Sequence, residues 1–192
     1  ISESPTHREY EGKSFATLAE ETEKDPYEIM FDLLISDEGR TTLITFEMSE
    51  RDVVQVLSHP LSMIGSDGEV QNVNYREKPH PRTYGAFARV FAQYVREGIL
   101  RPEEAVRKMS SFPAQKLGLT DRGLISEGMR ADLVIFDLKE FEDKATYEEP
   151  QRYAEGVKYV FVNGEPVIEN GIITGLTPGQ VLRKGNSNHK EA

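Results

Sequence analysis

The sequence predicts an α/β protein in which a parallel α/β portion is followed by a small antiparallel β unit. Helical and strand-like segments alternate over residues 14–97, which favours parallel strands joined by right-handed crossovers. From residue 131 onward, short β-branched runs follow one another, and Asn163-Gly164 separates two of them with a strong hairpin signal. The 38% of hydrophobic residues is enough for a packed core.

The helices of the first portion are predicted from their capping residues and apolar spacing. Ser14 precedes a short helix, and Asp25-Pro26-Tyr27-Glu28 combines a capping Asp, a proline in the first turn and a Glu three residues after the cap. Ser49-Glu50-Arg51-Asp52 opens a third helix, which ends at His59-Pro60. The clearest helical spacing of apolar residues begins at Tyr84 and runs to Val95.

Strands are predicted from compact apolar runs. Thr41–Phe46 and Leu61–Gly65 are expected to be buried strands of the parallel portion. Pro102 and Pro113 then start two further helices. The antiparallel unit is expected to contain strands at residues 132–136, 157–162, 166–168 and 172–173.

The composition excludes several classes of function. Lys and Arg number 23 against 33 Asp and Glu, which gives a formal net charge of −10. Such an acidic chain argues against nucleic acid or an anionic membrane as the main partner. No apolar run approaches the ~18 residues of a membrane span, no signal-peptide pattern opens the chain, and the absence of Cys excludes cysteine nucleophiles. We therefore expect a cytoplasmic protein with neither nucleic acid nor a membrane as partner.

Asp67 is the first candidate for chemistry. It lies in Gly65-Ser66-Asp67-Gly68, directly after an apolar run, and in parallel α/β folds functional groups collect where strands end. A carboxylate placed there could act on a substrate or a metal. The alternative is an ordinary turn, because Ser, Asp and Gly are common turn residues.

Arg82 is the second candidate. It follows Lys78-Pro79-His80-Pro81, which the two prolines hold extended, and it stands at the start of the helix that continues through Tyr84. A guanidinium beside free helix N–H groups favours an anion such as a substrate carboxylate. The alternative is a solvated loop arginine. No two of the histidines, His7, His59, His80 and His189, stand at metal-ligand spacing.

Several motifs are shared with a known family. Two are narrow: Met63-Ile64-Gly65-Ser66-Asp67-Gly68, and His80-Pro81-Arg82 continued through Phe87. Ala131-Asp132-Leu133-Val134 and Val162-Asn163-Gly164 are broader and identify only a superfamily. From about Gly12 to Lys184, the chain resembles the D-aminoacylases, or N-acyl-D-amino-acid deacylases, of the amidohydrolase superfamily.

This resemblance implies the C-terminal part of a zinc-dependent (β/α)₈ TIM barrel, followed by part of a small β-sandwich. Residues 1–120 would belong to the barrel, 121–184 to the β-sandwich, and 185–192 to a polar tail. Thr41–Phe46 would be the seventh barrel strand, and the strand ending at Ile64 the eighth. A barrel typically needs around 250 residues, so the resemblance implies a portion of a longer enzyme.

The resemblance also assigns roles to the candidate residues. Asp67 would take a proton from the metal-bound water and pass it to the leaving amine, and it could itself contact the metal. Arg82 would bind the carboxylate of an N-acyl-D-amino acid, with Ser66 and Gly65 as further substrate contacts.

The family's principal zinc ligands include a His-x-His pair and a cysteine, which this chain does not contain. Zinc binding and activity are therefore expected to need the N-terminal part of the barrel, and the chain alone is expected to be inactive. Two alternatives stay open. One is another cyclic-amide hydrolase of the superfamily, similar to hydantoinases or dihydroorotases, and the other is a catalytically inactive structural module.

Overall fold

The structure is a computed structural model that describes residues 1–70 and 78–183. The predicted polar tail, residues 185–192, lies outside the described residues. Chain contacts divide the described part into two compact units, each built from several segments. The first, which we name the helical unit, contains Ile1–Met48, the described residues of Asp67–Gly85, and Lys144–Tyr153. The second, the sheet unit, contains Ser49–Ser66, Ala86–Asp143 and the described residues from Ala154 onward.

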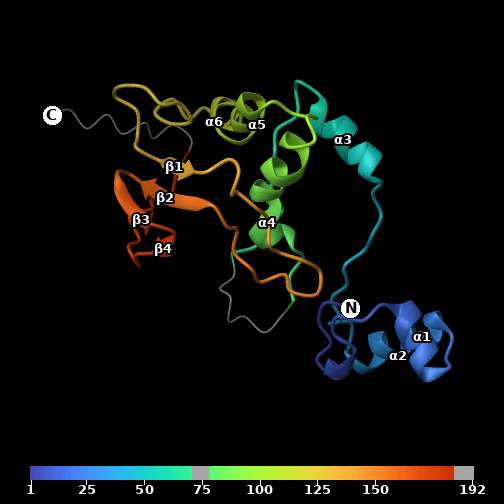
Figure 1. The fold of residues 1–192 in the computed structure, drawn as a ribbon. Coiled ribbons are helices and arrows are strands. Elements are labelled where there is room, and N and C mark those ends of the chain that lie inside the picture. Colours follow the sequence, from blue (N-terminus) through green and yellow to red (C-terminus); the bar gives the residue numbers. More distant parts are fainter. Residues whose placement is uncertain (71–77, 184–192) are drawn as a thin grey trace. The chain divides into compact units, whose positions relative to one another are not determined.

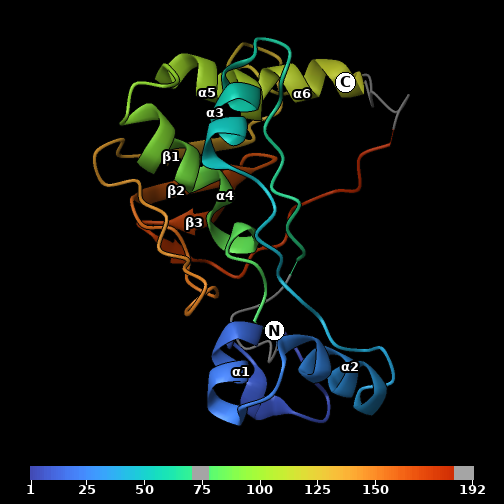
Figure 2. The same ribbon diagram turned by 90° about the vertical axis from the view of Figure 1, so that its right-hand side faces the viewer.

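The helical unit is built on α1 (Phe15–Thr22) and α2 (Pro26–Ser36), which pack against each other (Figure 2). Both predicted caps are confirmed. The Ser14 side chain accepts a hydrogen bond from the Thr17 N–H, and the Asp25 carboxylate accepts one from the Tyr27 N–H. A short 3₁₀ helix, η1 (Arg8–Tyr10), precedes these helices. The core of the unit consists of the buried side chains Leu18, Ile29 and Leu33, with Ile1, Tyr10, Phe15 and Ala19 packed around them.

Asp37 lies fully buried at the C-terminal end of α2. Its carboxylate accepts hydrogen bonds from Ser4 Oγ at 2.8 Å, Thr41 Oγ1 at 2.6 Å, the Thr6 N–H at 3.0 Å and the Thr6 hydroxyl. Burial opposes ionisation, but the hydrogen bonds from Thr41, Thr6 and Ser4 outweigh it and hold the pKa of Asp37 well below its usual range. The carboxylate thus ties the N-terminal segment and the residues after α2 to the end of that helix.

The helices of the sheet unit follow the predicted order. They are α3 (Glu50–Ser58), capped by Ser49 as predicted, α5 (Pro102–Met109) and α6 (Ser111–Leu117). The long predicted helix is present as α4 (Arg82–Arg89), which begins in the helical unit, and continues as the π-helical η2 (Val90–Val95). Phe91 of η2 packs against Phe136 and Phe141, with ring centroids 5.1 and 5.6 Å away.

The sheet is antiparallel, with the strand order β1 (Leu133–Phe136), β2 (Val157–Val162), β3 (Glu165–Glu169) and β4 (Ile172–Ile173) (Figure 1). Asn163 and Gly164 join β2 to β3 with φ values of 50° and 85°, and Asn170-Gly171 joins β3 to β4 with φ of 52° and 79°. Positive φ at both central residues is the geometry that Asn-Gly favours in tight hairpins. The predicted antiparallel unit is therefore confirmed.

The predictions of strands at Thr41–Phe46 and Leu61–Gly65 are wrong for this structure. Thr42 forms an isolated bridge with Glu3 and accepts a backbone hydrogen bond from Ser2, and Ile64 donates a backbone hydrogen bond to Lys108. A parallel strand exists only where neighbouring strands accept and donate its backbone hydrogen bonds. Within residues 1–70 and 78–183 these segments meet no such neighbour, and no parallel sheet forms there. The division at residue 120 stays a prediction.

No helix in the described part of the chain is long and apolar enough to cross a membrane.

Candidate active site

Asp67 and Arg82 lie in direct contact within the helical unit. Arg82 Nη2 is 2.7 Å from Asp67 Oδ2, and Arg82 Nε donates a hydrogen bond to the Asp67 carbonyl oxygen at 3.0 Å. Arg82 is the first residue of α4, and Asp67 has a left-handed backbone with φ of 50°. The two residues that the narrow motifs single out are therefore brought together, and the guanidinium binds both the side chain and the main chain of Asp67.

This ion pair is open to solvent. The Asp67 side chain is 84% exposed and that of Arg82 is 44% exposed. An exposed pair of this kind contributes only ~0–1 kcal/mol to stability. A ligand carboxylate can therefore replace the Asp67 carboxylate on the guanidinium at small cost, which suits an anion-binding residue.

Gly65 and Ser66 precede Asp67 in the chain, at the end of a segment that belongs to the sheet unit. A Cβ atom built on Gly65 would meet nothing within 4 Å, so its backbone borders open space. Their predicted contact with substrate stays a prediction.

His80 contacts the first residue of α4, and Tyr147 contacts His80. His80 Nδ1 accepts a hydrogen bond from the Arg82 backbone N–H at 3.1 Å, and Tyr147 Oη lies 3.3 Å from His80 Nε2. The two flanking prolines mark His80 in the sequence as part of a stiff segment. No local pattern marks Tyr147, because it lies 67 residues after His80 in the chain.

Lys108 fixes the segment that leads to Gly65. It lies in α5, its side chain is 0% exposed, and burial lowers its pKa. Its Nζ donates hydrogen bonds to the His59 carbonyl oxygen at 2.5 Å and to Ser62 Oγ at 2.8 Å. The Lys108 carbonyl oxygen accepts from the Ile64 N–H at 3.1 Å. Residues 59–64 are therefore held by hydrogen bonds with the buried Lys108 and not by the predicted pairing of strands.

We expect Lys108→Met to lower the free energy of unfolding by about 2 kcal/mol, because the partly buried acceptors of His59 and Ser62 lose their charged donor. Urea denaturation followed by circular dichroism measures this change. Lys116→Met, at an exposed position in α6, is the matched control and should change stability by less than about 0.5 kcal/mol. Equal stability of both variants would show that the Lys108 contacts contribute little.

The described residues do not fit a complete metal site. In residues 1–70 and 78–183, no three His, Cys, Asp or Glu side chains lie close enough together to hold a metal ion. His7 stacks on Tyr10 with ring centroids 5.1 Å apart and lies 3.2 Å from Glu9. His59 accepts a hydrogen bond from the Leu61 N–H. These contacts give both histidines a local structural role.

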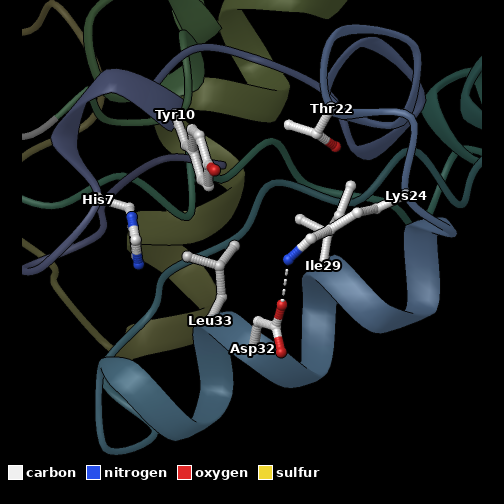
Figure 3. Close-up of a pocket in the computed structure, with 7 residues that line it drawn as sticks. All are labelled: His7, Tyr10, Thr22, Lys24, Ile29, Asp32 and Leu33. Atoms are coloured by element: carbon white, nitrogen blue, oxygen red, sulfur yellow. Dashed lines mark hydrogen bonds and ion pairs between the residues drawn. The ribbon is translucent and has the colours of Figure 1, made fainter.

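The helical unit has a small hollow whose lining residues include neither Asp67 nor Arg82 (Figure 3). It lies beside α2, where Lys24 Nζ is 2.8 Å from Asp32 Oδ2. Its volume is about 90 Å³, whereas pockets for small ligands usually measure about 300–1,000 Å³. It is too small to hold an N-acyl amino acid.

Residues 17–168 match the sequence model of the amidohydrolase family, and the chain belongs to this family. Within the family it is similar to N-acyl-D-amino-acid deacylases over most of its length, as its motifs predict. It is 38% identical to the N-acyl-D-aspartate deacylase of Alcaligenes xylosoxydans xylosoxydans over 88% of this chain and 34% of that protein. It is also 38% identical to the D-aminoacylase of the same organism, over 92% of this chain and 35% of that protein.

Solved structures agree with this assignment. The N-acyl-D-glutamate deacylase of Bordetella bronchiseptica, solved with zinc and a phosphonate inhibitor, aligns with a TM-score of 0.76 at 35% identity. The alignment covers 87% of this chain and 34% of that one. The chain therefore spans about a third of the length of these relatives.

Proposed function

We propose that this chain is part of a zinc-dependent amide hydrolase that removes the acyl group from N-acyl-D-amino acids. The pairing of Asp67 with Arg82 carries the proposal, because it joins a proton-transfer group to an anion-binding group. Relatives named as deacylases of N-acyl-D-aspartate and N-acyl-D-glutamate align with most of the chain and support this class of substrate.

In the proposed reaction, Asp67 accepts a proton from the attacking water and gives it to the amine nitrogen as the C–N bond breaks. Arg82 binds the substrate α-carboxylate through charge-assisted hydrogen bonds. Without substrate, Arg82 holds Asp67. A bound substrate carboxylate would take the place of the Asp67 carboxylate on Arg82 and leave Asp67 available for proton transfer. Gly65 and Ser66 would border the same substrate.

We propose that zinc is held mainly by residues outside this chain, because the described residues form no cluster of metal-binding side chains. The solved N-acyl-D-glutamate deacylase contains zinc, which supports this cofactor for the whole enzyme. Asp67 would be at most an additional contact to the metal.

We also propose that residues 1–120 complete a TIM barrel together with the rest of the enzyme, and that residues 121–184 belong to a β-sandwich. Large apolar side chains are exposed in the helical unit, among them Phe31 at 56%, Ile35 at 78%, Phe46 at 76% and Met48 at 81%. Exposed apolar groups of this number favour coverage by further protein. The rest of the barrel would also supply the neighbouring strands with which Thr41–Phe46 does not pair in the described part of the chain.

Arg82→Ala in the complete enzyme tests the proposed substrate. We expect KM for an N-acetyl-D-amino acid to rise about 10–100-fold with little change in kcat, because about 1.5–3 kcal/mol of charge-assisted hydrogen bonding is lost. Steady-state hydrolysis of this substrate and of its α-carboxamide measures the effect.

Arg89→Ala, at the other end of α4, is the matched control and should leave both KM values close to wild type. An equal rise in KM for the carboxamide would show that Arg82 has a structural role and would contradict the proposal.

A further inference from the structure

We propose that His80 and Tyr147 are positioning residues that hold Arg82 in place for the substrate carboxylate. This inference rests on the proposed function of Arg82. It connects the segment Lys144–Tyr153, which contains none of the shared motifs, with substrate binding.

His80 is hydrogen-bonded to the backbone of Arg82. A backbone N–H can only donate, so His80 Nδ1 accepts, at 3.1 Å. The His80 carbonyl oxygen also accepts from the Thr83 N–H at 3.0 Å. His80 therefore satisfies two of the N–H groups that a helix leaves without partners in its first turn, and it fixes where α4 begins.

Tyr147 contacts the second ring nitrogen of His80, Nε2. With Nδ1 accepting, the neutral ring carries its proton on Nε2, which donates to Tyr147 Oη at 3.3 Å. The two rings meet edge to face with centroids 5.2 Å apart, and Phe46 packs against Tyr147 at 4.8 Å. These contacts fix both the tautomer and the orientation of His80.

The contacts of His80 affect substrate binding through the backbone of Arg82. Arg82 begins α4, so the direction of its side chain depends on the backbone that His80 holds. The guanidinium is 44% exposed, and packing alone does not restrain it. Loss of the His80 or Tyr147 contact would widen the range of guanidinium positions and weaken carboxylate binding, while Asp67 would keep its own place in the loop.

The experiment compares Tyr147→Phe, His80→Gln and His80→Asn in the complete enzyme. Asn places an oxygen close to the position of Nδ1, whereas Gln places its polar atoms near Nε2. We expect KM for an N-acetyl-D-amino acid to rise about 3–10-fold in Tyr147→Phe and His80→Gln, with kcat within about twofold. His80→Asn should restore much of the lost affinity, because it keeps an acceptor for the Arg82 N–H.

Tyr153→Phe is the matched control. Tyr153 lies in the same segment and is 53% exposed, but its ring packs against Tyr84 at 5.5 Å. We expect its KM to equal that of the wild type. In an Arg82→Ala background, Tyr147→Phe should have no further effect on KM, because its contribution acts through Arg82.

The outcomes separate the two proposals. If Arg82→Ala raises KM selectively but Tyr147→Phe and His80→Gln do not, the positioning role is wrong and the proposed function stands. If Tyr147→Phe raises KM equally for the α-carboxamide substrate, His80 and Tyr147 support the fold in general, which also overturns the inference. If Arg82→Ala has no selective effect, the proposed role of Arg82 fails, and the positioning role fails with it.

Discussion

Asp67→Asn is expected to lower kcat for N-acyl-D-amino acid hydrolysis by about 10²–10⁴-fold while the enzyme stays folded. Asn has nearly the same shape as Asp but does not accept and release a proton as a carboxylate does. It also tolerates the left-handed backbone at this position, where φ is 50°. The lost ion pair with Arg82 is exposed and costs ~0–1 kcal/mol.

The Michaelis constant separates proton transfer from binding in this variant. Because Asp67 occupies Arg82 in the absence of substrate, its removal should leave KM unchanged or lower it. Glu69→Gln is the matched control, since Glu69 is an exposed acid two residues further along the chain. Steady-state kinetics of both variants would refute the assignment if Asp67→Asn kept a wild-type kcat, or if Glu69→Gln lost as much activity.

The local features of the fold were predictable because they depend on neighbouring residues. Ser14, Asp25 and Ser49 each cap the helix that follows, since their side chains reach N–H groups two or three residues ahead. The two Asn-Gly turns likewise adopt positive φ without help from distant parts of the chain. These elements are correct in both position and type.

The strands at Thr41–Phe46 and Leu61–Gly65 were not predictable from their own residues. Their apolar, β-branched composition favours a strand, but a strand forms only where other strands pair with it. In the described residues, these segments make backbone hydrogen bonds to Ser2, Glu3, His59 and Lys108, none of which belongs to a strand. The composition therefore indicates a preference for strand structure, but no adjacent strand in the described residues pairs with these segments.

The candidate site was partly predictable. The motifs identify Asp67 and Arg82, which the structure places in contact. Tyr147 carries no signal in the sequence, because its partner His80 is distant in the chain and an isolated Tyr most often belongs to a core. Asp37 and Lys108 were missed for a related reason. Each looks like an ordinary charged residue in or beside a helix, and only the tertiary structure buries it.

Asp37→Ala should lower the free energy of unfolding by about 3 kcal/mol. The donors of Ser4, Thr6 and Thr41 would lose their charged acceptor inside the protein. Urea denaturation monitored by circular dichroism measures the loss. Asp32→Ala, in the middle of α2, is the matched control, because Asp32 is 60% exposed and pairs only at the surface with Lys24.

The dependence on pH distinguishes the charge of Asp37 from its shape. Its pKa is lower in the folded than in the unfolded protein, so its stabilising contribution is complete above the ordinary carboxyl pKa of about 4 and decreases as the pH falls below it. The difference in stability between wild type and Asp37→Ala should therefore be constant near neutral pH and shrink progressively below about pH 4. A difference that stays constant into the acid range would mean that the Asp37 side chain stabilises the end of α2 through packing and not through its negative charge.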